Sequence, residues 1–268
     1  MSPSASIASL IAPHLPYLRR YARALTGSQV AGDTAVAATL KAIITDRGGF
    51  DDTVAPRLAL YRMFQGHWHE GQVADRASDL EGSDFATIAG TRLAAITPLP
   101  RQALLLSAME GFTTEDVGFL VDRSAAEVLA LVAEALADID RQTTTRVLII
   151  EDEPIIALDI ETIVRDLGHA VTGMASTADE AMAMFHSETP GLVLADIQLA
   201  DRSSGIDAVR EMLAEHPVPV IFITAFPERL LTGERPEPTF LITKPFQTAT
   251  VKAAISQALF FNSTSQPG

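Results

Sequence analysis

Five short apolar runs, rich in β-branched residues, alternate with amphipathic segments over the second half of the chain. The runs are RVLII (146–150), HAVTGMA (169–175), GLVLADI (191–197), PVPVIFIT (217–224) and TFLITKPF (239–246). Segments between them, such as PIIALDIETIVRDLG and GIDAVREMLAEH, have the apolar spacing of helices. Apolar strands joined by helices form a parallel sheet that helices cover on both faces. We therefore expect an α/β domain with a doubly wound, five-stranded parallel sheet.

The first half of the chain has a helical pattern instead. In LIAPHLPYLRRYARAL, apolar residues recur every three or four positions. The segment 99–140 predicts three further helices in a helix-turn-helix layout. Leu99-Pro100 is expected to start the first of these helices, and Gly111 to end it. Thr113 or Thr114 is expected to cap the second helix, and Ser124 the third.

These patterns predict two domains joined by a short linker. We expect an all-α domain at residues 1–142, with helical units at about 7–45 and 97–140. The connector between the units, at about 46–96, contains one helix candidate, RLALYRMF. Three threonines at 143–145 are the predicted linker, and the α/β domain follows at 146–263. A chain of 268 residues is long enough for both, since domains usually have roughly 100–200 residues.

Charge and composition exclude several classes of function. The formal net charge is −14 and the isoelectric point is about 4.8, and an acidic surface gains nothing from counterion release on a nucleic acid. The chain has no cysteine, so a disulfide or a thiolate metal site is impossible. The N-terminus does not resemble a secretory signal, and no apolar run approaches the roughly 18 residues of a membrane span. We expect a soluble, cytoplasmic protein that binds neither nucleic acid nor membrane.

Polar side chains follow four of the five apolar runs. They are Glu151 and Asp152 after the first run, Asp196 after the third, Thr224 at the end of the fourth and Lys244 after the fifth. Ligands of a doubly wound sheet bind beyond the carboxyl ends of its strands, so these side chains should converge. Crowded carboxylates favour Mg²⁺, and Asp196 can then act as a nucleophile toward a phosphoryl group whose charge Lys244 helps to neutralise. Viewed singly, the segments EDEP and ADIQL are explained just as well without a site, as solvated loop residues or as helix N-caps.

The segments LIIEDEP, LVLADIQL, VIFITAF and FLITKPF resemble the strand-end motifs of response-regulator receiver domains, over essentially all of 146–261. The resemblance implies that Asp196 is the phosphoacceptor and receives its phosphoryl group from a sensor histidine kinase or a phosphotransferase. It implies that Asp152, Asp196 and the main-chain carbonyl of Gln198 bind Mg²⁺, with Glu151 assisting through water. Thr224 and Lys244 would contact the phosphoryl group. Such a protein is a signalling protein that at most catalyses its own phosphorylation and dephosphorylation.

One position departs from the usual receiver pattern. Receivers commonly have Tyr or Phe three residues before the lysine, whereas this chain has Leu241. An aromatic residue, Phe226, instead lies two positions after Thr224, as in the receiver subgroup that has a Phe-x-Thr-x-aromatic motif. We expect Phe226 to be the switch residue, with the alternative that it is a core residue. The proline-rich segment 227–240 leaves room for only a short helix.

The helical half resembles the extracytoplasmic-function sigma factors, with YLRRYARALTG similar to their region two and 97–140 similar to their region four. A DNA-reading helix needs arginine or lysine for phosphates and base edges. Over 99–141, however, the sequence has three basic and eight acidic residues. We therefore expect no direct DNA binding. An anti-sigma factor, which recognises apolar helix faces, is the expected partner instead.

A sigma-like half followed by a receiver resembles the PhyR family, the anti-anti-sigma response regulators of the alphaproteobacterial general stress response. The resemblance implies that phosphorylation of Asp196 releases the sigma-like domain to sequester an anti-sigma factor, which frees the sigma factor. Two alternatives are a phosphorylation-controlled DNA-binding sigma factor or transcriptional regulator, and a phosphohydrolase with Asp196 as nucleophile. His67 and His69 in GHWHE could suggest a metal site, but paired histidines of this kind more often belong to a helix surface or core.

Overall fold

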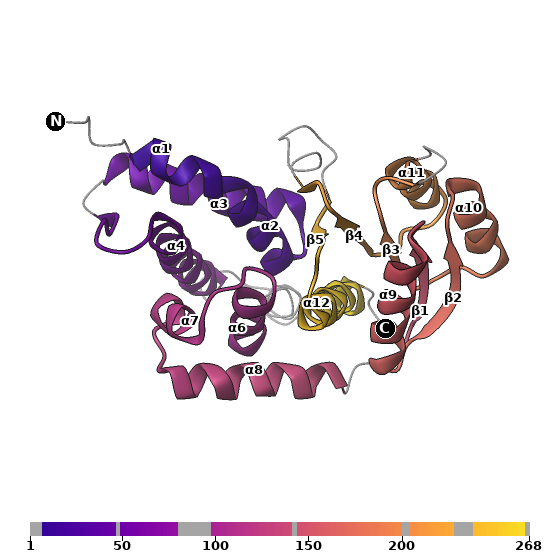
Figure 1. The fold of residues 1–268 in the computed structure, drawn as a ribbon. Helices are drawn as coiled ribbons and strands as arrows, with labels where there is room; N and C mark the ends of the chain where they lie inside the picture. Colours follow the sequence, from indigo (N-terminus) through magenta and orange to yellow (C-terminus); the bar gives the residue numbers. More distant parts are fainter. Residues whose placement is uncertain are drawn as a thin grey trace. The chain divides into compact units, whose positions relative to one another are not determined.

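The computed structural model describes residues 7–46, 49–79, 98–140, 144–199, 204–227 and 238–265, and Figure 1 labels their helices and strands. The chain divides into two compact units, Met1–Ala133 and Glu134–Gly268, so the division falls within helix α8 (Ala125–Asp140). The predicted linker lies partly outside the described residues, because Thr143 is not among them. Its other two residues, Thr144 and Thr145, belong to no helix or strand.

The first unit is helical, as the sequence predicts. Its elements are α1 (Ile7–Ile11), a 3-10 turn (Ala12–His14), α2 (Leu15–Thr26), α3 (Gln29–Thr45), α4 (Pro56–Asp79), α6 (Leu99–Ala108), α7 (Thr114–Val121) and the first part of α8. The helix candidate in the predicted connector is confirmed, but α4 has 24 residues and supplies the buried side chains of Leu60, Tyr61 and Phe64. The rest of the connector, 80–97, lies outside the described residues.

Hydrogen bonds from capping side chains define the helix-turn-helix segment. Thr113 is the N-cap of α7 and forms a capping box with Asp116, which decides between the two predicted cap residues. Ser124 caps α8, since its Oγ accepts a hydrogen bond from the Glu127 amide. The preceding helix, α6, ends at Ala108 rather than at the predicted Gly111, which has a left-handed φ of 68°. The three predicted helices are therefore present with small changes in their ends.

Helices α2 and α3 cross at a glycine. A Cβ atom at Gly32 would lie 2.6 Å from the backbone nitrogen of Arg23, so no larger residue fits without moving a helix. The same contact brings Asp33 beside two arginines of α2, at 3.2 Å from Arg19 and 2.9 Å from Arg23. Two arginines of the segment YLRRYARALTG are therefore paired with an acid of the same unit.

A buried ionic cluster, which we call the Glu110 cluster, joins three segments of the first unit. It consists of Glu110 after α6, Arg20 of α2, and Arg57 and Tyr61 of α4. Glu110 Oε1 accepts from Arg20 Nη2 at 2.8 Å, and Glu110 Oε2 accepts from Arg57 Nη2 at 3.0 Å and from the Tyr61 hydroxyl at 2.8 Å. The Glu110 side chain is fully buried, so its charge is stabilised by these donors rather than by water. Burial, and then the Glu110 charge, raises the pKa of Tyr61, which keeps its hydroxyl as a donor.

The second unit is the predicted five-stranded parallel sheet. Its strands are β1 (Arg146–Ile150), β2 (Ala170–Ala175), β3 (Leu192–Ala195), β4 (Val220–Thr224) and β5 (Phe240–Thr243), in the spatial order β2-β1-β3-β4-β5. The helices are α9 (Pro154–Asp166), α10 (Ala178–Ser187), α11 (Gly205–Glu215) and α12 (Thr248–Ser265). Helices α10 and α11 pack beside each other on one face of the sheet, and α9 and α12 pack on the other (Figure 1). The doubly wound α/β architecture is therefore confirmed.

The sheet is held between apolar layers. On the face covered by α10 and α11, Leu148, Val193 and Phe222 of the strands form a core with Phe185 and Met212 of the helices. Burial on both faces explains why the strands are near-continuous apolar runs. The predicted short helix in 227–240 falls mostly on 228–237, which lie outside the described residues.

Candidate functional site

Four strands place polar side chains at the carboxyl edge of the sheet. Glu151 and Asp152 come directly after β1, Asp196 directly after β3, and Lys244 directly after β5, while Thr224 is the last residue of β4. Parallel strands end at the same edge, so the order β1-β3-β4-β5 brings these residues together although 93 positions separate the first from the last. The sequence-based prediction of where each strand ends is confirmed.

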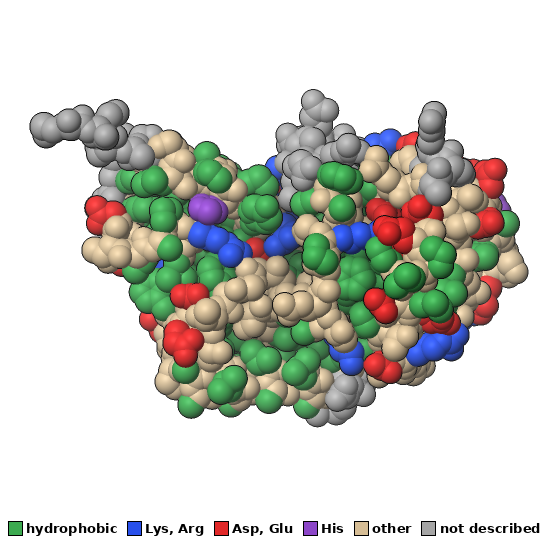
Figure 2. All heavy atoms as spheres, viewed as in Figure 1, with side chains coloured by type: hydrophobic (Ala, Val, Ile, Leu, Met, Phe, Trp, Pro, Cys, Tyr) green, Lys and Arg blue, Asp and Glu red, His purple; other side chains and the backbone are tan. Residues whose placement is uncertain are grey.

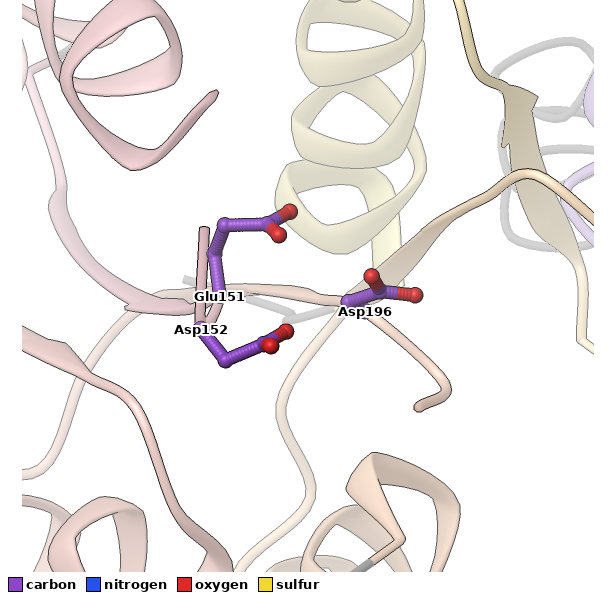
Figure 3. Close-up of side chains that lie close together, drawn as sticks. All are labelled: Glu151, Asp152 and Asp196. Atoms are coloured by element: carbon purple, nitrogen blue, oxygen red, sulfur yellow. The ribbon is translucent and has the colours of Figure 1, made fainter. Parts of the chain in front are cut away.

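Three carboxylates gather at this edge. Glu151, Asp152 and Asp196 each offer an oxygen within 4.8 Å of the others, and Figure 3 shows the first two pointing toward Asp196. Glu151 and Asp196 are buried, at 3% and 8% exposure, and Asp152 is half-buried. Such crowding of negative charge in a partly dry site is unfavourable unless a cation is present.

Lys244 supplies one such cation. Its Nζ lies 2.7 Å from Asp196 Oδ2 and 2.8 to 2.9 Å from the two oxygens of Glu151, and Glu153 Oε1 lies 3.8 Å away. Burial opposes the charge of the ammonium group, but hydrogen bonds to Asp196 and Glu151 outweigh it and raise the pKa of Lys244. Lys244 therefore stays protonated and holds the two carboxylates together. Glu153, which the strand-end pattern did not indicate, has an exposed carboxylate that adds to the negative charge beside Lys244.

The donor set also fits Mg²⁺. The pKa of Glu151 is raised, chiefly by burial, so its carboxylate lacks solvation that a cation would replace. Glu151 Oε2 is near Lys244 but makes no well-oriented hydrogen bond, which leaves a buried acceptor unsatisfied. Oxygen ligands of this kind, with room for water, are those that Mg²⁺ prefers. The three clustered carboxylates are thus suited to hold a divalent cation.

The other predicted site residues lie along the same edge. The Thr224 hydroxyl, in a residue that is 1% exposed, accepts a hydrogen bond from the Phe226 amide at 3.1 Å. Phe226 is 42% exposed, so the alternative that it is a core residue is wrong. Leu241 is buried within the sheet's core, and Gln198 is exposed two residues after Asp196. The role of Phe226 as the switch residue stays a prediction.

Two histidines proposed as a weak metal candidate lie elsewhere. His67 and His69 are in α4, and within the described ranges they belong to no group of three or more metal-ligating side chains. His69 Nδ1 lies 2.9 Å from the Gln65 carbonyl oxygen, which is a local helix contact. No described helix is long and apolar enough to span a membrane.

A glycine that no sequence pattern indicated shapes the Asp196 loop. Gly205 begins α11, and its amide donates to the Ile197 carbonyl at 3.0 Å. A Cβ atom at 205 would overlap the carbonyl oxygen of Asp196. The sequence shows only a glycine that opens a helix-like segment, and no regular spacing connects it with Asp196.

We therefore expect Gly205→Ala to disturb the site more than any ordinary surface change. Either α11 or the Asp196 backbone must shift, because neither of the clashing groups is a flexible side chain. The expected cost is about 1–3 kcal/mol of stability, with a loss of Mg²⁺ affinity. Chemical denaturation and a Mg²⁺ titration would measure both quantities. Gly66→Ala, a glycine whose added Cβ meets nothing within 4 Å, is the matched control. Unchanged stability and Mg²⁺ affinity in Gly205→Ala would contradict this account of the loop.

Comparisons with known proteins match nearly the whole chain. Three family models match: the sigma2 domain of PhyR over residues 11–65, the sigma-like domain of the response regulator PhyR over residues 93–142, and the response regulator receiver domain over residues 147–256. The phyllosphere-induced regulator PhyR of Methylorubrum extorquens is 52% identical over 262 residues, which are 97% of each chain.

Solved structures agree with the sequence comparisons. The crystal structure of the response regulator PhyR from Brucella abortus is 53% identical, with a TM-score of 0.84 over 98% of this chain and 97% of that one. The anti-anti-sigma factor PhyR from Bartonella quintana is 50% identical, with a TM-score of 0.84 over 97% of this chain and 98% of that one. The similarity therefore covers the helical half and the α/β half in the same order.

Proposed function

The chain belongs to the PhyR family of response regulators, and from this we propose that it is a phosphorylation-activated anti-anti-sigma regulator of a general stress response. Phosphorylation of Asp196 releases the sigma-like domain, residues 1–142, to bind an anti-sigma factor, and the sigma factor is freed. The observation that carries this proposal is the presence, in one chain, of a strand-edge aspartate beside Lys244 and of a sigma-like half in which five described arginines pair with acids of the same unit. A solved relative is itself described as an anti-anti-sigma factor.

The site residues support phosphoryl transfer to Asp196. An oxygen of Asp196 forms the new bond to phosphorus, and the bond from phosphorus to the donor's leaving group breaks. Glu151, Asp152, Asp196 and the Gln198 carbonyl would hold Mg²⁺, which supplies charge neutralisation when bound. Lys244 already contacts Asp196 and is placed to pair with a phosphoryl oxygen, and the Thr224 hydroxyl is a further donor.

The phosphoryl group is also the expected trigger of the conformational change. It adds about −1.5 to −2 charges next to Lys244 and Thr224, where the Phe226 amide now donates to the Thr224 hydroxyl. When Thr224 turns to the phosphoryl group, that bond is lost, which removes one restraint on Phe226. A sensor histidine kinase or a phosphotransferase is the donor. The protein is a regulator rather than an enzyme, and the reactions it assists are its own phosphorylation and dephosphorylation.

The sigma-like half supports protein binding rather than DNA binding. Five of its arginines pair with acids of the same unit: Arg19 and Arg23 with Asp33, Arg20 and Arg57 with Glu110, and Arg62 with Asp122. Helix α8, where a sigma factor would read DNA, has no basic residue. It exposes Leu129 at 62% and Leu136 at 39%, and Figure 2 shows hydrophobic side chains over this helix. Apolar helix faces of this kind suit a helical partner.

Binding measurements with the full-length protein test the proposal. The protein is titrated with the anti-sigma factor of the same organism and with promoter DNA, before and after treatment with acetyl phosphate and Mg²⁺. Allosteric coupling of usual size predicts anti-sigma binding about 5- to 150-fold tighter after phosphorylation, and no DNA binding at low salt. Phosphorylation-dependent DNA binding would favour the alternative of a DNA-binding regulator. Equal affinity for the anti-sigma factor before and after phosphorylation would contradict the proposed switch.

A further inference from the structure

The two sigma-like segments of the first unit meet at a joint that arginine side chains cross. Different family models match the two segments, over residues 11–65 and 93–142. Helix α2 packs against α6 at this joint, and α4 packs against α7. Three arginines of the first segment donate hydrogen bonds to the second, and we call them the joint arginines: Arg20, Arg57 and Arg62. Each of these bonds has its donor in the first segment and its acceptor in the second.

Arg62 binds the C-terminal end of α7. Its Nη1 donates to the carbonyl oxygens of Phe119 and Leu120, at 2.7 and 3.1 Å. Its Nη2 donates to Asp122 Oδ1 at 2.6 Å, and this hydrogen bond chiefly lowers the pKa of Asp122, which keeps the carboxylate ionised. The last carbonyl groups of a helix have no partner within it, so an arginine from outside can satisfy them. One side chain of α4 therefore holds the end of α7 at three points.

The turn that Arg62 holds leads directly into α8. Asp122 follows the last residue of α7 with a left-handed φ of 55°, and Ser124 caps α8. A Cβ atom at Gly118 would lie 2.5 Å from the Arg123 carbonyl oxygen, so the turn folds back closely onto α7. Because the turn is this tight, the start of α8 follows the end of α7, and a side chain that fixes one also fixes the other.

The ion pair of Arg62 adds little to stability. The Arg62 side chain is 36% exposed and that of Asp122 is 74% exposed. Ion pairs as exposed as this one contribute little to the free energy of unfolding, because water and salt screen them. The Glu110 cluster, whose carboxylate is fully buried, is the stabilising part of the joint instead. Arg62 is therefore better suited to orienting the second segment than to holding the fold together.

An exposed aromatic ring flanks the joint in each segment. Tyr17 of the first segment and Phe119 of the second are both 39% exposed. A joint arginine lies over each ring: the guanidinium carbon of Arg20 is 5.3 Å from the Tyr17 centroid, and that of Arg62 is 5.3 Å from the Phe119 centroid. Aromatic and arginine side chains are enriched at protein interfaces. A partner that covers both rings needs the two segments in one fixed arrangement.

We propose that Arg62 is a positioning residue for the anti-sigma factor. It fixes the end of α7 and the start of α8 relative to α4, so that the two segments form one binding surface before the partner arrives. This inference rests on the proposed function and says how its binding surface is organised. A preformed surface avoids the cost of ordering on binding. Where only a fraction of the molecules has the competent arrangement, the apparent affinity falls by that fraction.

Binding kinetics of the full-length, phosphorylated protein with the anti-sigma factor of the same organism test this role. Arg62→Met removes the guanidinium and keeps an unbranched side chain. We expect about tenfold weaker binding, caused by slower association at an unchanged dissociation rate. Loss of a direct contact with the partner would instead speed dissociation. Arg19→Met is the matched control, because the ion pair of Arg19 with Asp33 lies within the first segment, and it should bind as the wild type does.

A cross-link tests whether position is what Arg62 supplies. The chain has no cysteine, so Arg62→Cys combined with Asp122→Cys creates a single pair of thiols, which a short bifunctional maleimide can join. This double variant should associate slowly before cross-linking and at the wild-type rate after it, although the guanidinium is absent. Hydrogen exchange without the partner is an independent readout. Amides of residues 119–128 should exchange faster in Arg62→Met than in the wild type, while circular dichroism shows that the variant is folded.

The outcomes separate this inference from the proposed function. Absence of binding by the phosphorylated wild type would contradict the proposed function, and this inference with it. If the wild type binds, the positioning role alone is overturned when Arg62→Met associates as fast as the wild type or dissociates faster. It is also overturned when the cross-linked double variant stays slow to associate, or when hydrogen exchange at residues 119–128 is the same in Arg62→Met and the wild type.

Discussion

Asp196→Asn is expected to reduce phosphate incorporation from acetyl phosphate by on the order of a hundredfold or more. The amide has nearly the shape of the carboxylate, and Lys244 keeps its ion pair with Glu151, so the fold should survive. What is lost is the oxygen nucleophile. Intact-protein mass spectrometry after treatment with acetyl phosphate and Mg²⁺ measures the phosphorylated fraction directly.

Glu153→Gln is the matched control for this substitution. This substitution also removes one negative charge, from a carboxylate that lies 3.8 Å from the same Lys244 nitrogen. The Glu153 side chain, however, is 64% exposed. Phosphate incorporation in Glu153→Gln should remain near that of the wild type. If Asp196→Asn is still phosphorylated at the wild-type level, another carboxylate is the acceptor, and peptide mapping would distinguish Asp152 from Glu151.

Glu110→Ala is expected to lower the free energy of unfolding of the first unit by about 3–5 kcal/mol. The substitution leaves the buried guanidinium of Arg20 without its anion, and it removes the acceptor of the Tyr61 hydroxyl. Arg57 loses the carboxylate and keeps only its bond to the main-chain oxygen of residue 110. Domains are usually stable by only about 5–15 kcal/mol, so the unit should unfold at much lower urea concentrations. The single tryptophan of the chain, Trp68, lies in α4, so its fluorescence follows the first unit alone.

Glu115→Ala controls for the loss of one negative charge in the same unit. Glu115 is exposed in α7, and a change there should alter the free energy of unfolding by about 0.5 kcal/mol or less. The account of the Glu110 cluster fails if the urea midpoint of Glu110→Ala equals that of Glu115→Ala. Anti-sigma binding by Glu110→Ala is expected to fall together with stability, since the cluster connects α2, α4 and the end of α6.

The architecture of the second unit and the position of its site could be predicted because both depend on local patterns. Apolar runs identify buried strands, and the residue after each run identifies the site edge, so the convergence of Asp196 and Lys244 follows from parallel topology alone. The approximate positions of the helices in the first unit follow from capping residues and apolar spacing. The exact ends of α6 and the length of α4 do not follow from these signals, because tertiary packing can extend or shorten a helix beyond them.

The Glu110 cluster and Gly205 could not be predicted for a different reason. Glu110 pairs with Arg20, which is 90 positions away, and nothing in the sequence near either residue indicates the other. A count of formal charges treats Glu110 as an exposed acid, whereas the structure places it in the interior. The contact of Gly205 with the Asp196 carbonyl depends on how a loop returns to the strand, which a single sequence does not encode in any regular spacing.

The internal pairing of arginines in the first unit shapes the electric field that an approaching molecule meets. A guanidinium held against a carboxylate a few ångströms away forms a dipole, whose field falls off much faster than that of a free charge. The long-range field of the unit is therefore set by its exposed acids, among them Glu115 and Glu127. Basic partners are steered toward such a surface and acidic polymers are kept from it, which sets the rate of encounter before any contact forms.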